Sequence, residues 1–246
     1  MKQDHPIWSA SVLTLFPEMF PGPLGHSLAG RALERGLWSL DCYQIRDFAT
    51  GRHKDVDAPA CGGGVGLVMR ADVMGAAIDH VLSLHDNRPV MLYPSPRGRP
   101  VSQPFLRELA EQCGALFVCG RYEGLDQRVI DHYQLVEISV GDYVLSGGEL
   151  AALTIMDGVV RLLDGVMGNP EGHLSDSFEN GLLEHSQYTL PRQWKQMDVP
   201  EILLSGHHQQ IADYKFQQAC EITQIRRPDL WQAYQANKQA KNDDKY

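Results

Sequence analysis

The sequence predicts an α/β protein with a mostly parallel sheet, followed by a smaller helical C-terminal domain. Over the first two-thirds of the chain, short runs of β-forming residues alternate with helix-like segments. A glycine-rich stretch then breaks this alternation, and only helical patterns follow it. Strands that alternate with helices typically form a parallel sheet covered by helices. With 246 residues, the chain can bury a substantial core in one large domain or two modest ones.

The expected elements follow from β-forming runs and from apolar residues at helical spacing. Strands are expected at Val12–Phe16, Leu40–Ile45, Val90–Tyr93, Leu116–Cys119 and Leu135–Ile138, and helices at Leu24–Arg35, Asp72–Leu84 and Pro104–Gln112. A buried helix is expected over Glu149–Leu163, with Ser146 as its N-cap at the capping-box spacing from Glu149. Two more helices are expected over Ile202–Gln224 and Pro228–Lys241.

This pattern divides the chain into an α/β domain (1–164), a flexible linker (165–181) with four glycines and one proline, and a helical domain (182–246). The net charge is −9, and the helical domain carries eight basic and eight acidic residues, so the acidic excess lies before residue 182. Because non-specific nucleic-acid binding relies on neutralising phosphates, this balance argues against a general nucleic-acid coat protein.

Nothing in the sequence indicates export or a membrane anchor. No run approaches the roughly 18 apolar residues of a membrane span, and the N-terminus lacks the apolar region of a secretory signal. The five cysteines include no C-x-x-C pair, and their odd number fits reduced thiols better than a disulfide framework or a zinc site. We therefore expect a cytoplasmic protein that contacts no membrane.

Three loops follow consecutive predicted strands: Tyr93–Gly98, Gly120–Asp126 and Val140–Glu149. Each combines glycine with tyrosine, and the last two add carboxylates such as Glu123 and Asp142. Ligands of parallel sheets bind beyond the carboxyl ends of the strands, so the three loops are expected to form one pocket. Taken alone, Gly120–Asp126 fits an ordinary strand-to-helix turn better than a ligand site. The next loop, Val140–Glu149, repeats this combination of glycine, tyrosine and carboxylate, and the repetition shifts the balance toward a ligand site.

These loops favour a cationic nucleoside as the ligand. Their backbone groups can hydrogen-bond an adenine edge, and their carboxylates favour a positively charged sulfonium. A polyphosphate would prefer bare amides with lysine or arginine, so S-adenosylmethionine is favoured over ATP. The segment Gly62–Gly66 matches neither the dinucleotide nor the P-loop spacing. A flexible surface loop and a mobile lid over the ligand both remain open for it.

Two charged residues are candidates for catalysis, each with a structural alternative. Arg161 is either a surface arginine with a packed stem or a fixed donor to a base or phosphate. From spacing alone, Asp176 fits an Asx-turn better than a general base. His207 and His208 are adjacent, so they rarely share one metal ion. The pair Arg226–Arg227 fits a solvated helix end or a phosphate contact.

Together, these motifs resemble the TrmD family of bacterial tRNA (guanine-N1)-methyltransferases over nearly the whole chain. The most specific matches are Gly120–Gly124 and Gly141–Glu149. The others are Leu15–Phe20, Arg46–Phe48, Gly62–Gly64, Gly66, Tyr93, Ser95–Pro96, Arg161, Asp176–Phe178, Gly181–Glu184, Tyr188–Thr189, Ser205–His208 and Arg226–Pro228.

The resemblance implies a SPOUT fold with a deep trefoil knot over about residues 90–164, and a homodimer whose active sites are built from both subunits. It implies methylation of N1 of guanosine 37 in tRNA, next to the anticodon, with Asp176 as general base and Arg161 as its catalytic partner. The helical domain would grip the anticodon arm, and the linker would order when tRNA binds. The implied contacts to S-adenosylmethionine are Tyr93, Ser95, Pro96, Gly120, Tyr122, Glu123, Gly124, Val140, Gly141, Asp142, Tyr143, Val144, Leu145, Gly147 and Gly148. A requirement for Mg²⁺ is also implied, although the sequence offers no dedicated ligand cluster.

A few positions depart from the family pattern, and they affect expected tRNA contacts more than methyl transfer. They are Val65, Pro94, Arg97, Ser186–Gln187 and Leu190. A non-catalytic tRNA- or cofactor-binding member is one alternative, against which Asp176 and Arg161 speak. Another SPOUT enzyme, acting on ribose or pseudouridine, would not require the Asp176 linker and the helical domain together.

Overall fold

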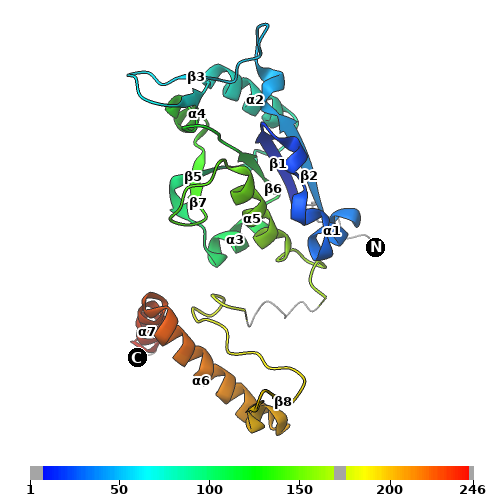
Figure 1. The fold of residues 1–246 in the computed structure, drawn as a ribbon, viewed down its shortest axis with the longest axis vertical. Helices are drawn as coiled ribbons and strands as arrows, with labels where there is room; N and C mark the ends of the chain where they lie inside the picture. Colours follow the sequence, from blue (N-terminus) through cyan, green and yellow to red (C-terminus); the bar gives the residue numbers. More distant parts are fainter. Residues whose placement is uncertain (1–7, 169–175, 244–246) are drawn as a thin grey trace. The chain divides into compact units, whose positions relative to one another are not determined.

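The structure, a computed structural model, describes residues 8–168 and 176–243. The chain divides into two compact units, residues 1–170 and 171–246, whose ribbons are drawn in Figure 1. Residues 169–175, in the middle of the predicted linker, lie outside the described residues. The predicted flexibility of this linker therefore stays a prediction.

The N-terminal unit is built on a five-stranded parallel sheet with the order β2-β1-β6-β5-β7 (Figure 1). Its strands are β1 (Trp8–Thr14), β2 (Trp38–Gln44), β5 (Val90–Pro100), β6 (Gly114–Val118) and β7 (Val136–Ser139). A separate antiparallel hairpin consists of β3 (Asp57–Pro59) and β4 (Leu67–Met69). Each of the five predicted strands overlaps one of the sheet strands, and the predicted α/β fold class is confirmed. The trefoil knot stays a prediction.

Helices cover both faces of this sheet. They are α1 (Ser27–Glu34), α2 (Ala71–Ser83), α3 (Gln103–Ala110), α4 (Gln127–Tyr133) and α5 (Glu149–Val160), with 3₁₀ turns at Pro17–Met19, Gly22–Gly25 and Ile45–Phe48. Residues of α1, α3 and α5 form one core cluster with the sheet, and residues of α2 and α4 form the other. In β6, Ala115 and Phe117 belong to the first cluster and Leu116 and Val118 to the second, because successive side chains point to opposite faces.

Strand β5 bends outward near its carboxyl end. Its pairing with β7 shifts register between Pro94 and Arg99, and both residues lie opposite Ile138. The extra residues leave the sheet as a bulge. Gly98 returns so close to β7 that a Cβ built on it would lie 2.2 Å from the amide nitrogen of Ile138. This bulge directs the backbone around Ser95 away from the sheet, beside the ends of β6 and β7.

Helix α5 begins at Glu149, as expected, but ends at Val160, before the expected Leu163. Its N-cap is Gly148, and no side chain caps it, so the prediction of Ser146 as N-cap is wrong. The physical reason lies in Glu149, whose carboxylate accepts hydrogen bonds from Thr14 and Arg121 instead of reaching back to the helix start. Arg161 is the C-cap residue and follows the last helical residue, Val160.

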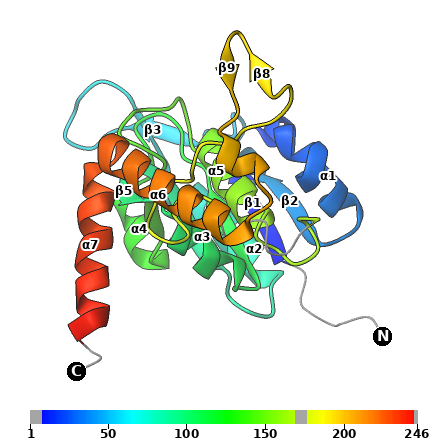
Figure 2. The ribbon, with the colours of Figure 1, turned by 90° about the horizontal axis from the view of Figure 1, so that it is seen from below.

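The C-terminal unit contains two helices among its described residues, α6 (His208–Arg226) and α7 (Pro228–Asp243), with a sharp turn of the chain between them (Figure 2). The expected helix over Ile202–Gln224 is interrupted: a 3₁₀ turn at Glu201–Leu204 ends before Gly206, whose φ of +73° is incompatible with a continuous helix. A small hairpin of β8 (Gln193–Trp194) and β9 (Met197–Asp198) was not predicted. In the part of the chain that the structure describes, no helix combines the length and apolar character needed to cross a membrane.

Candidate functional site

A cavity of about 330 Å³ opens at the carboxyl ends of β5, β6 and β7, entirely within the N-terminal unit. The three loops that the sequence grouped together line it. Its lining residues are Tyr93, Pro94, Ser95, Pro96, Arg97, Gly120, Arg121, Tyr122, Glu123, Gly124, Leu125, Ile138, Ser139, Val140, Gly141, Tyr143, Val144, Leu145, Ser146, Gly147, Gly148 and Ala151. Every residue expected to contact the cofactor is among them except Asp142.

Tyr93 forms the buried wall of this cavity and is 5% exposed. A Cβ built on Gly120 would lie 2.9 Å from the Tyr93 ring, and one built on Gly124 would lie 2.6 Å from its hydroxyl oxygen. The hydroxyl accepts a hydrogen bond from the Leu125 amide at 3.4 Å. Burial raises the pKa of Tyr93, so the wall is uncharged at neutral pH. The two glycines are therefore required by the close approach of this ring.

Arg121 and Glu149 tie the loop after β6 to the start of α5. The guanidinium contacts both carboxylate oxygens, with Nε 3.1 Å from Oε1 and Nη2 3.0 Å from Oε2. The Thr14 hydroxyl donates to Oε1 at 2.8 Å, and Arg121 Nη1 donates to the Ser146 carbonyl at 3.2 Å. The Arg121 guanidinium also lies 4.4 Å from the centre of the Phe16 ring. Three separate segments of the chain thus meet at one bidentate ion pair.

The electrostatics of the cavity differ from those of a polyphosphate site. Each of its two lining arginines is already paired with a carboxylate, Arg121 with Glu149 and Arg97 with Glu137 at 3.1 Å. Glu123 adds a carboxylate to the lining. A polyphosphate is best held by cations and open amides, whereas this arrangement suits a ligand that carries positive charge.

The hairpin β3–β4 borders the Glu123 loop. The Glu123 amide donates to the Leu67 carbonyl at 2.9 Å, and the Met69 amide donates to the Gly124 carbonyl at 2.9 Å. A Cβ on Gly66 would lie 2.5 Å from the Glu123 side chain. The residues of Gly62–Gly64 have positive φ angles, and a Cβ built on any of them would have no neighbouring atom within 4 Å. This segment is thus an exposed hairpin loop, and its role as a lid stays a prediction.

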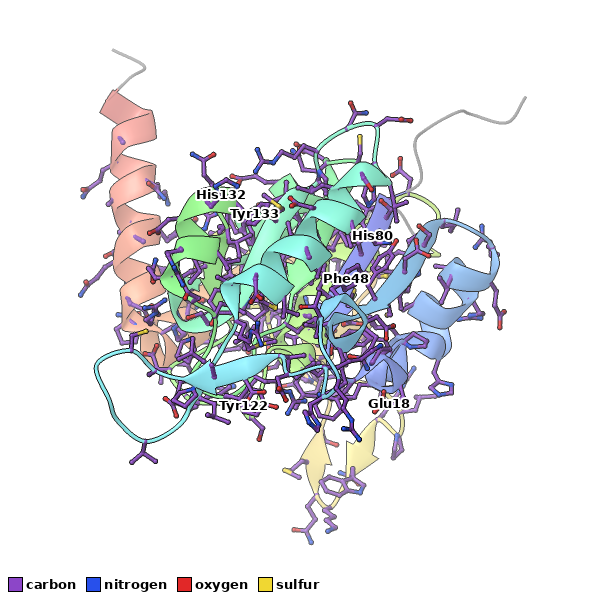
Figure 3. All side chains as sticks on the ribbon, turned by 90° about the horizontal axis from the view of Figure 1, so that it is seen from above. Glu18, Phe48, His80, Tyr122, His132 and Tyr133 are labelled. Atoms are coloured by element: carbon purple, nitrogen blue, oxygen red, sulfur yellow. The ribbon has the colours of Figure 1, made fainter. Side chains whose placement is uncertain are left out.

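Cys119 and Tyr122 lie near the cavity and differ in their exposure to solvent. Cys119, at the end of β6, is fully buried, and burial raises the pKa of its thiol well above the ordinary value. It is therefore no thiolate nucleophile at neutral pH. Tyr122, with a φ of +57°, is 52% exposed on the neighbouring loop (Figure 3). An aromatic face is thus available to a ligand there.

The two predicted catalytic residues belong to different units of the chain. Arg161 ends α5 in the N-terminal unit, and Asp176 begins a turn in the C-terminal unit. Each has polar interactions of its own. Among the described residues, no cluster of three or more His, Cys, Asp and Glu could hold a metal ion. Of the basic pair before α7, Arg227 is bound to Asp229 at 2.6 Å.

Sequence reasoning missed Ile138, Ser139 and Ala151, which line the cavity from outside the three predicted loops. Within those loops, it singled out no cofactor contact at Pro94, Arg97, Arg121, Leu125 or Ser146. Arg121 lies inside the Gly120–Gly124 motif, so its position was available. Its partner Glu149 lies 28 residues away in sequence, and no local pattern links the two.

The fold and the cavity define an α/β protein with a cavity at the carboxyl ends of a parallel sheet, together with a second, helical unit. Residues 9–233 match the family model of tRNA (Guanine-1)-methyltransferase TrmD. The chain therefore belongs to this family.

Curated relatives support the same assignment. A tRNA (guanine-N(1)-)-methyltransferase of Chelativorans sp. (strain BNC1) is 57% identical over 225 residues, which cover 92% of this chain and 95% of the relative. Proteins of the same name are 56% identical over 229 residues in Brucella ovis and in Brucella abortus (strain 2308). These alignments cover 93% of this chain and 93% and 92% of the two relatives.

Proposed function

We propose that this protein methylates N1 of guanosine 37 in tRNA, with S-adenosylmethionine as the methyl donor. Family membership and the names of the relatives support a tRNA guanine-N1 methyltransferase. The observation that carries the choice of donor is the cavity itself, in which both arginines are paired while Glu123 adds negative charge.

The residues of the cavity fit this methyl donor. Its volume of about 330 Å³ lies in the range of small-molecule sites. The glycine loops offer backbone groups for an adenine edge, and Tyr93, Val140 and Leu145 offer apolar surface. When bound, S-adenosylmethionine supplies a methyl group on a positively charged sulfur, and Glu123 favours that charge.

The chain itself must make guanine N1 nucleophilic. N1 carries a proton, and in this proposal the Asp176 carboxylate removes it as a general base. Arg161 then stabilises the negative charge that develops on the neighbouring guanine oxygen. The target base has to leave its stack to enter a pocket between loops. Asp176 and Arg161 thus have separate tasks, proton removal and charge stabilisation.

The C-terminal unit is proposed to hold the anticodon arm through shape, stacking and phosphate contacts. We also propose a homodimer. Large apolar side chains are exposed on the loop before α5 and on its first turn, with Val144 at 83%, Tyr143 at 57% and Leu150 at 54%, and such patches mark protein interfaces. Sedimentation of the purified chain would measure its mass in solution, and a monomer would contradict this part.

The test of the activity is transfer of labelled methyl from S-adenosylmethionine to an unmodified tRNA with guanosines at positions 36 and 37. Mass spectrometry should identify 1-methylguanosine at position 37, and a matched tRNA with adenosine there should stay unlabelled. Titration with Mg²⁺ belongs in the assay because the family implies this ion. Absence of transfer at every Mg²⁺ concentration, while the cofactor binds, would contradict the enzymatic proposal.

A further inference from the structure

The segment that carries Asp176 is a compact turn. The Phe178 amide donates to the Leu182 carbonyl at 2.8 Å, and the Glu184 amide donates to the Ser177 hydroxyl at 3.0 Å. The Glu179 amide donates to the carbonyl of Asp176 itself at 3.4 Å. These bonds within residues 176–184 fix the local shape of the backbone that presents Asp176.

Thr223 on α6 anchors this turn. Its hydroxyl donates to the Ala219 carbonyl at 2.6 Å and accepts a hydrogen bond from the Leu183 amide at 2.8 Å. One hydroxyl thus joins its own helix to the turn. Thr223 is 0% exposed, so water cannot take over the bond to Leu183.

The contact between the turn and α6 forms the core of the C-terminal unit. Of the side chains that the structure describes in this unit, only Leu182 and Thr223 are buried, at 7% and 0% exposed. A Cβ on Gly181 would lie 3.7 Å from the Tyr234 ring, which stacks on Trp231 with ring centres 5.7 Å apart. The turn therefore packs against both α6 and α7.

We propose that Thr223 is a positioning residue for the general base: it fixes the Asp176 turn to α6, so that Asp176 moves with the helical unit. This inference rests on the proposed function. In that function the helical unit holds the tRNA. The turn therefore brings the Asp176 carboxylate to the active site together with the bound tRNA. Proton removal is thereby tied to engagement of the helical unit.

The variant that tests this is Thr223→Val, which keeps the shape of the side chain but removes the hydroxyl. Amide hydrogen exchange of the full chain without ligands should show faster exchange over residues 177–184. Misplacement of a catalytic group by about 1 Å can cost on the order of 100-fold, so we expect kcat to fall about 10- to 100-fold. The dissociation constant of S-adenosylmethionine and the KM for tRNA should stay nearly unchanged.

Two further variants serve as controls. Thr223→Ser keeps the hydroxyl and should restore both the protection of the turn and kcat. Ser83→Ala removes an exposed hydroxyl that donates to the His80 carbonyl of its own helix, and it should change neither. If Thr223→Val fails to fold, Ser177→Ala loosens the turn without altering α6 and should act in the same direction on exchange and on kcat.

Unchanged exchange over residues 177–184 in Thr223→Val would overturn the anchor. Faster exchange with unchanged kcat, or a loss that appears in the KM for tRNA, would overturn the positioning role. A wild-type protein that transfers no methyl would contradict the proposed function and the catalytic part of this inference together. The exchange measurement would still report on the anchor alone.

Discussion

Arg121 and Glu149 form a bidentate ion pair, with atoms 3.0 and 3.1 Å apart, that joins two of the three loops around the cavity. Glu149 is 1% exposed, and the Arg121 side chain is 19% exposed. The Thr14 hydroxyl, at the end of β1, donates a hydrogen bond to the Glu149 carboxylate. The shape of the cavity thus depends on this charge pair.

We expect Arg121→Met to be strongly destabilising, because it leaves the Glu149 carboxylate buried without its counter-charge. Removing one partner of a buried pair costs about 3–5 kcal/mol. The double variant Arg121→Met, Glu149→Leu removes both charges and should cost clearly less. Urea unfolding of the wild type and of each variant measures both free energies. A double variant as unstable as Arg121→Met alone would show that packing, and not the charge pair, is what matters.

The sequence could predict the sheet because each strand is a short apolar run, and it could predict the cavity because its three loops leave adjacent strands. It could not predict the features that depend on tertiary contacts. Ser146 and Glu149 have the capping-box spacing, yet Glu149 is bound by Arg121 and Thr14. Likewise, Gly98 shows no local sign that it approaches the backbone of Ile138. Local sequence patterns set the conformation that a segment prefers. A stronger contact with a residue distant in sequence can override that preference.

Gly147→Val should weaken binding of S-adenosylmethionine. A Cβ there would lie 2.3 Å from Arg121 Nε and 2.6 Å from Glu149 Oε2, so the new side chain would force the ion pair apart and move both loops. A loss of about 1.4 kcal/mol already weakens binding tenfold, and calorimetry would detect that change. The control is Gly168→Val, at a position with open space around the added Cβ, which should leave affinity unchanged. Equal affinities for Gly147→Val and wild type would mean that the cofactor binds elsewhere.

Asp176→Asn should abolish turnover and leave cofactor affinity unchanged. The amide keeps the size of the side chain but cannot act as a base, and loss of general-base catalysis costs about 100- to 10,000-fold. The cavity lies entirely in the N-terminal unit, so the affinity measured by calorimetry should not respond. Glu179→Gln, a carboxylate change in the same turn, should retain most of the activity. A large loss of cofactor affinity in Asp176→Asn would instead make Asp176 part of the binding site.

Tyr133→Phe should change how stability depends on alkaline pH. The Tyr133 hydroxyl, at the end of α4 (Figure 3), donates to the Asp79 carboxylate at 2.7 Å and lies 3.1 Å from the Gly75 carbonyl on α2. Burial first, and then the hydrogen bond and charge of Asp79, raise the pKa of Tyr133 from 10.0 to about 12.

The folded state therefore keeps the phenol proton in a pH range where the unfolded chain releases it. The stabilisation is complete below pH 10 and is lost as the pH rises toward 12, because the unfolded state there binds fewer protons than the folded state. At pH 8 the variant should be less stable than wild type by about 1 kcal/mol, the worth of one hydrogen bond. This difference in the free energy of unfolding between wild type and variant should be smaller at pH 11, as measured by denaturant unfolding. Tyr122→Phe, on an exposed side chain, should show no such change, and an equal difference for Tyr133→Phe at both pH values would contradict the assignment.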